Sequence, residues 1–148
     1  MKQMLIVVML VLGSMATPRS ADAQTSPAEM AILKKKAVAR DALAQFNLGN
    51  AYYDGTGVPQ NKTEAVKWFR LAAAQGNDIA QYQLGFMYFE GEGVPEDFVQ
   101  AYKWWNLAAA AGIANAKKNK GNVAAKMTEE QIVEAQRLST AFTPTKTP

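Results

Sequence analysis

The sequence predicts an all-α fold, an α/α superhelical solenoid built from stacked helix pairs. A pattern that begins at Leu48 returns at Leu84, and a second pattern that begins at Ala65 returns at Ala101. Both returns come 36 residues later, with no insertion between the copies. A fixed period of this length indicates supersecondary units that bury their apolar faces against one another.

Each unit is predicted to contain two helices that are joined by a glycine loop and closed by a turn. In the first unit, residues 41–76, Asp41 is placed to cap the first helix, and the loop at Gly55 and Gly57 ends it. Asn61, with Glu64 three residues later, has the capping-box pattern that opens a second helix. The second unit, residues 77–112, has Gly91, Gly93, Asp97 and Gln100 at the matching positions.

The spacing of apolar residues predicts which side chains join the two helices of a unit. Positions four residues apart share one face of a helix, so Leu48 and Tyr52 are expected to face the stripe that contains Trp68. A small residue at Gly49 would allow the helices to approach closely, with Trp68 filling the space beside it. We therefore expect six residues to be buried: Leu48, Tyr52, Trp68, Leu84, Tyr88 and Trp104.

More polar elements are expected at both ends of the array, because terminal units must face water. Residues 27–40 are predicted to form an N-terminal cap helix that begins with a capping box at Ser26 and Glu29. Residues 113–142 form a degenerate third unit followed by a C-terminal cap helix, so the repeat domain covers residues 24–142. The tail, residues 143–148, consists of threonine, proline and lysine and is expected to be disordered.

The first 23 residues have the layout of a secretory signal peptide. Lys2 precedes an apolar run from Met4 to Leu12, and small residues follow. That run is shorter than the roughly 20 residues of a membrane-spanning helix. We expect cleavage after Ala23, alternatively after Ala16, and a periplasmic or secreted protein without a stable membrane anchor.

The composition argues against catalysis and against several classes of ligand. The chain has no histidine and no cysteine, which excludes histidine-based triads, cysteine nucleophiles and the common zinc sites. A net charge of +3 is too mild to indicate binding to nucleic acid. We expect no enzymatic activity, no cofactor and no metal, and a protein or peptide partner.

The repeated string A-x-x-x-L-G-x-x-Y-x-x-G-x-G-V, followed by A-x-x-W-x-x-x-A-A-x-x-G, resembles the Sel1-like repeat, a relative of the tetratricopeptide repeat. It runs from Ala44 to Gly76 and again from Ala80 to Gly112. The resemblance implies an α/α superhelix that serves as an adaptor for other macromolecules. Exported bacterial members of this family are associated with envelope signalling, secretion or contact with host proteins.

A second stripe on the first helices is the candidate binding site. Phe46, Asn50 and Tyr53 return as Tyr82, Phe86 and Phe89, and the third copy has Lys118 and Asn122 at matching positions. By the resemblance to tetratricopeptide repeats, these positions line a concave groove for an extended peptide with an acidic group. The alternative interpretation is that the rings pack one repeat against the next. The predicted peptide-binding residues are Phe46, Asn50, Tyr53, Tyr82, Phe86, Phe89, Lys118 and Asn122.

A second hypothesis uses the carboxylates around the second glycine loop. Glu90, Glu92, Glu96 and Asp97 could serve an envelope carbohydrate-binding or hydrolase-accessory protein if two of them converged in one pocket. Loop carboxylates are ordinarily hydrated, and Asp97 already has a capping role. The clusters of lysines at 34–36 and 117–120 are interpreted as solvated helix faces.

Overall fold

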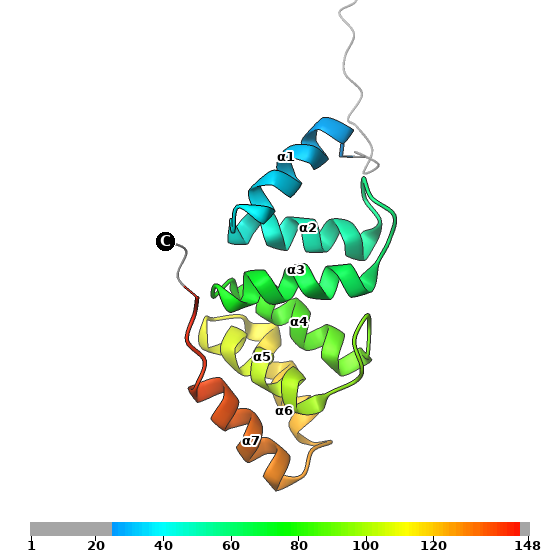
Figure 1. Cartoon of the computed structure of the whole chain (residues 1–148). Coiled ribbons are helices and arrows are strands. Elements are labelled where there is room, and N and C mark those ends of the chain that lie inside the picture. Colours follow the sequence, from blue (N-terminus) through cyan, green and yellow to red (C-terminus); the bar gives the residue numbers. More distant parts are fainter. Residues whose placement is uncertain (1–24, 146–148) are drawn as a thin grey trace, which may run out of the picture.

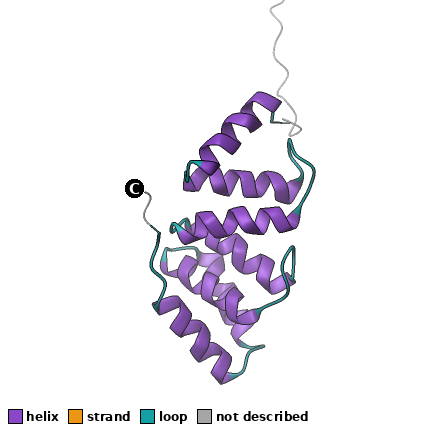
Figure 2. Cartoon of the chain, viewed as in Figure 1, coloured by secondary structure: helices purple, strands orange, loops and turns teal. Residues whose placement is uncertain are grey.

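The computed structural model describes residues 25–145, which form helices and no strand (Figures 1 and 2). The expected signal peptide lies outside the described residues. The helices are α1 (Pro27–Val38), α2 (Ala42–Asp54), α3 (Lys62–Ala74), α4 (Asp78–Glu90), α5 (Phe98–Ala110), α6 (Ala114–Ala124) and α7 (Glu129–Thr140). The all-α class predicted from the sequence is confirmed for this part of the chain.

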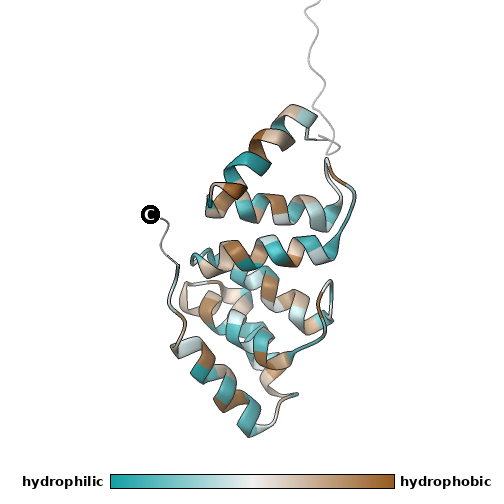
Figure 3. Ribbon diagram, viewed as in Figure 1, coloured by the Kyte–Doolittle hydropathy of each residue, from teal (hydrophilic) through white to brown (hydrophobic). Residues whose placement is uncertain are grey.

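Helices α1 to α6 stack in the order of the sequence, as in a solenoid (Figure 1). Within the two repeats α2 packs on α3 and α4 packs on α5, while α3 and α4 join one repeat to the next. Helix α1 covers α2 at one end. At the other end α5 carries both α6 and α7. Apolar and polar residues alternate along the helices at the front of Figure 3, and no described helix has the length and apolarity that a membrane span needs.

An aromatic ring lies directly on a glycine within each repeat. A Cβ added at Gly49 would lie 2.7 Å from the ring of Phe69, and one added at Gly85 would lie 2.6 Å from the indole of Trp105. These separations are far below the contact distance of two carbons, so the glycines allow the close approach of the helices. Phe69 therefore takes the place that the sequence assigned to Trp68.

Four of the six residues expected to be buried are buried: Leu48, Leu84, Tyr88 and Trp104. The expectation was wrong for Tyr52 and Trp68, which are half-buried. Both lie at the edge of a small cluster formed by α1 and α2, and Tyr52 also contacts the larger core. Trp104 is covered by Phe142, which follows α7 and meets the indole edge-on at a centroid distance of 5.7 Å.

The loops have the expected glycines, all with positive φ: Gly55, Gly57, Gly91 and Gly93. At Gly93 a side chain would collide with the backbone of Lys62, so this loop seats on the start of α3. Asn61 and Asp97 cap α3 and α5 by accepting the third amide of each helix. The reciprocal half of the expected capping box at Asn61 is not formed, because Glu64 pairs with Lys67 instead.

Two glutamines that occupy equivalent positions connect successive helix pairs. The side chain of Gln45 donates to the carbonyl of Ala37 at 3.1 Å, and Gln81 donates to the carbonyl of Ala73 at 3.2 Å. Both glutamines are buried. Each glutamine adds a second donor to a carbonyl at the end of the preceding helix, which also accepts the amide of Arg40 or Gly76.

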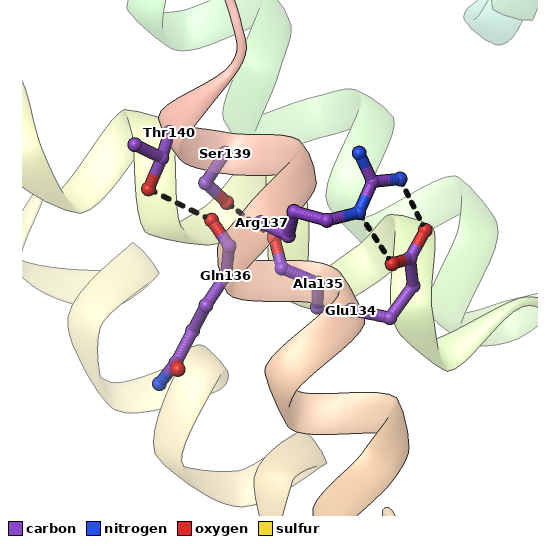
Figure 4. Close-up of polar contacts among 6 residues, drawn as sticks. All are labelled: Glu134, Ala135, Gln136, Arg137, Ser139 and Thr140. Atoms are coloured by element: carbon purple, nitrogen blue, oxygen red, sulfur yellow. Dashed lines mark hydrogen bonds and ion pairs between the residues drawn. The ribbon is translucent and has the colours of Figure 1, made fainter.

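Helix α7 is fixed to α5 and begins with a complete capping box at Thr128. Ser139 donates to the carbonyl of Ala135 at 2.8 Å, and its hydroxyl lies 3.4 Å from the carbonyl of Lys103 on α5. Figure 4 shows the Ser139 bond within α7 and the two-pronged ion pair between Arg137 and Glu134.

After α7 the chain runs back along the array toward α3 (Figure 1). Thr145 donates its amide to the carbonyl of Ala74 at 2.8 Å, and its hydroxyl lies 3.2 Å from the same oxygen. Residues 143–145 belong to the tail for which disorder was expected, and the structure places them by the hydrogen bonds of Thr145 to the end of α3.

Candidate functional site

The predicted aromatic stripe lies on α2 and α4, and none of its rings is fully buried. Phe46, Tyr53, Tyr82, Phe86 and Phe89 are all half-buried, as is Asn50. Each ring therefore packs on the core with one side while another side meets solvent. We call the stripe, with its continuation on α6, the aromatic face.

Two exposed aliphatic residues extend the aromatic face by one helical turn. Leu43 is 61% exposed and Ile79 is 48% exposed. They are equivalent positions of the two repeats, and each lies three residues before a predicted ring, Phe46 or Tyr82. The sequence analysis did not select them, although the 36-residue spacing that relates them was available.

A cavity of about 210 Å³ opens on the aromatic face between α4, α5 and α6. Its walls are the rings of Phe86, Phe89 and Trp105, and its polar rim is made of side chains from α4 and α6. Those rim residues are Glu90, Asn119 and Asn122. Three of the predicted site residues, Phe86, Phe89 and Asn122, therefore come together around one opening.

The wall of the cavity is an aromatic stack. Phe89 lies 5.6 Å from Phe98 and 5.5 Å from Trp105, measured between ring centroids. The ammonium group of Lys126 lies 4.9 Å from the centroid of Phe89. Ring pairs at these distances and a cation over a ring are both attractive, so the stack holds Phe89 in place.

The contribution of α6 differs from the one that the sequence suggested. Lys118 is exposed and does not line the cavity. The neighbouring residue, Asn119, does so, and its amide lies 3.4 Å from the hydroxyl of Tyr82. The backbone carbonyl of Tyr82 accepts a hydrogen bond from the indole of Trp105 at 3.1 Å. Tyr82 is thus fixed at both its backbone and its side chain.

Tyr53 belongs to a separate polar cluster between the repeats. Its hydroxyl donates to Glu92 at 2.8 Å, and Lys62 pairs with the same carboxylate at 2.7 Å. The hydrogen bond to Glu92 and, second, burial raise the pKa of Tyr53 to about 12. The hydrogen bonds from Lys62 and Tyr53 lower the pKa of Glu92. Phe46, at the other end of α2, packs on Phe69 with 5.9 Å between centroids.

The loop carboxylates are separated by the contacts they make. Asp97 accepts the Gln100 amide at 3.0 Å as a helix cap, and Glu92 is held by Lys62 and Tyr53. Of this set only Glu90 lines the cavity. General acid–base catalysis by two carboxylates requires both to face one substrate, an arrangement that these contacts do not provide. No cluster of three metal-binding side chains occurs among the described residues.

A family model described as the Sel1 repeat matches residues 42–77 and 78–113. The protein carries two Sel1 repeats. These ranges begin one residue after the boundaries expected from the sequence.

Two solved structures share the fold. One is a protective antigen present in uropathogenic Escherichia coli strains, which displays an SLR fold. Its identity is 36%, its TM-score is 0.73, and the match covers 77% of this chain and 25% of that one.

The other structure is a Sel1 repeat protein from Oxalobacter formigenes, at 43% identity and a TM-score of 0.60. That match covers 61% of this chain and 26% of the other. The chain thus spans about a quarter of the length of both structures. Sel1 repeats generally mediate interactions between proteins, and the family is typically non-catalytic.

Proposed function

We propose that this protein is a non-enzymatic adaptor of the bacterial cell envelope that binds a protein or peptide partner through the aromatic face. The observation that carries this proposal is the pair of equivalent rows on α2 and α4, in which no large side chain is fully buried. Aromatic and aliphatic side chains that remain accessible on a rigid helix are typical anchors for a partner.

The size of the cavity favours one side chain of a partner protein over a small molecule. Its volume of about 210 Å³ is below the usual size of a small-molecule pocket, roughly 300–1,000 Å³. Asn119 and Asn122 stand at its rim, where amide groups can pair with the backbone of a bound segment. An apolar partner side chain between Phe86 and Trp105 fits this arrangement.

The charge at the rim of the cavity does not favour the acidic peptide group that the sequence suggested. Lys118 lies outside the cavity, and Glu90 is the charged residue that lines it. The Glu90 carboxylate would repel an acidic group there, whereas it would not repel an apolar side chain. The envelope location continues to depend on the expected signal peptide, residues 1–23.

The test is a capture experiment with two variants that match in exposure. Ile79 on the aromatic face and Leu71 on α3 are both 48% exposed. We expect a partner from an envelope extract to bind the protein spanning residues 24–148 and its Leu71→Ala variant. Ile79→Ala should lower the affinity for the purified partner about 5- to 100-fold, which corresponds to about 1–3 kcal/mol.

Thermal unfolding of both variants provides the control, since neither side chain belongs to the buried core. Equal affinity of Ile79→Ala and the unmodified protein would show that the partner does not use the aromatic face. N-terminal sequencing of the mature protein tests the location separately and should begin at Gln24.

A further inference from the structure

The turns that join successive helix pairs form a second edge of the array, and the three among the described residues have similar backbone conformations. They are residues 39–41, 75–77 and 111–113, spaced by the repeat period. The central residues, Arg40, Gly76 and Gly112, have φ values of 69°, 92° and 101°. Their amides donate to the carbonyls of Ala37, Ala73 and Ala109 at 3.0–3.1 Å. We call these turns the turn edge.

The chain's own C-terminal strap, residues 143–145, occupies the middle of the turn edge. Both hydrogen bonds of Thr145 go to the carbonyl of Ala74, just before the turn. Pro144 lies 3.6 Å from the position that a Cβ of Gly76 would take. At the equivalent Gly112 nothing lies within 4 Å. The middle turn is therefore filled by a threonine–proline–threonine segment, and its counterpart in the next repeat is not.

An open groove of about 770 Å³ continues from Thr145 to the first turn. The strap and Gln75 form one wall, and residues 39–43 form the other. The two large apolar side chains with the highest exposure among the described residues flank that turn, with Val38 at 72% and Leu43 at 61%. The groove is largely open to solvent, a shape that accommodates an extended segment rather than an enclosed small molecule.

We propose that the turn edge is a second binding site, for an extended threonine- and proline-containing segment of another protein. The strap occupies part of this site in cis. The strap indicates what chemistry fits: a backbone N–H and a hydroxyl directed at a helix-end carbonyl, and a proline ring against a turn that has no side chain. The two sites share only Leu43, so an experiment can contradict one proposal without contradicting the other.

A tethered strap competes strongly with a free segment because its effective concentration is on the order of millimolar. The probe is a fluorescent peptide with the sequence of residues 141–148, titrated into the full chain and into a chain that ends at Phe142. Keeping Phe142 preserves its contact with Trp104. We expect the shortened chain to bind the peptide at least tenfold more tightly than the full chain.

A peptide with Thr145→Pro is the control, because it lacks both the amide proton and the hydroxyl that reach Ala74. It should lose at least tenfold in affinity for the shortened chain. Amide chemical shifts should change at residues 75–77 and at Arg40 when the normal peptide binds.

Three results would overturn the proposal. The first is no binding to the shortened chain below about 1 mM while circular dichroism shows unchanged helicity. The second is equal binding of the two peptides. The third is a full chain that dimerises in light scattering and becomes monomeric on shortening, because a second copy would then be the occupant.

Discussion

The two repeats carry tryptophans at equivalent positions, yet the protein buries only one of them. Trp104 in the second repeat is buried, and Trp68 in the first repeat is half-buried. The local sequence around the two is similar, so the difference comes from the neighbours. Helix α7 packs on α5 and places Phe142 against Trp104, whereas Trp68 on α3 packs against the small cluster formed by α1 and α2. Burial in this array depends on what covers a repeat as well as on the repeat itself.

The largest expected effect tests this difference directly. Replacement of a buried tryptophan by alanine usually costs about 3–5 kcal/mol of unfolding free energy. We expect Trp104→Ala to fall in that range and Trp68→Ala to cost about half as much, because water already reaches part of its ring. Urea unfolding followed by circular dichroism measures both.

Trp104→Phe serves as the control for the first prediction. It keeps a ring against Phe142 and removes an indole N–H that is buried and unpartnered among the described residues. Its cost should be well below that of Trp104→Ala. Equal costs for the alanine variants at positions 68 and 104 would mean that α7 does not determine the difference.

The second prediction compares the glycine contacts of the two repeats. In a helix Gly→Ala is ordinarily stabilising by about 1 kcal/mol. Here we expect Gly85→Ala to destabilise by about 1–3 kcal/mol, because its methyl group would overlap Trp105. Gly49→Ala should cost less. Trp105 is tethered to the Tyr82 carbonyl by a hydrogen bond, and the Phe69 ring has no polar atom with which to form one.

Chemical denaturation of the single variants, and of Gly85→Ala combined with Trp105→Phe, measures these costs. The smaller ring should recover part of the loss if the overlap is its cause. A stabilised Gly85→Ala variant would show that the helices can separate without penalty.

The smallest expected effect concerns the polar cluster between the repeats. The position equivalent to Glu92 in the first repeat is Thr56, so only the second loop provides a carboxylate. The lowered pKa of Glu92 gives a stabilising contribution that is complete above its ordinary value of 4.5 and is lost as the pH falls below it. The pKa of Tyr53 is raised from its ordinary value of 10.0 to about 12. Its stabilising contribution is therefore complete below pH 10 and is lost as the pH rises from 10 to 12.

Glu92→Gln should reduce the stabilising contributions of both Glu92 and Tyr53. The free energy of unfolding at neutral pH should fall by at most about 1 kcal/mol. Tyrosinate absorbance should show one tyrosine titrating closer to pH 10 in this variant than in the unmodified protein. An unchanged titration curve would mean that Glu92 does not control Tyr53.

The sequence was sufficient for features that depend on the repeat period and on local signals. The helix pairs, the glycine loops and the caps at Asp41 and Asp97 all follow from residues near one another in the chain. It was insufficient for Trp68, because tertiary neighbours decide the burial of a side chain. The same holds for Asn119, whose approach to Tyr82 depends on how α6 turns against α4. The strap combines a polar composition with a docking site far away in the sequence, so composition alone suggested disorder.

The buried glutamines have a consequence for how long such an array can grow. Each one couples a helix pair to the pair before it, and the equivalent residue of the third copy is the exposed Lys117. A lysine side chain placed at that junction would carry an ammonium group into an apolar contact. A protein lengthened by a duplicate of residues 78–113 would gain a second copy of Gln81 at the new junction. A duplicate of the third copy would place Lys117 there instead. The second repeat therefore carries its own coupling residue, and the third copy does not.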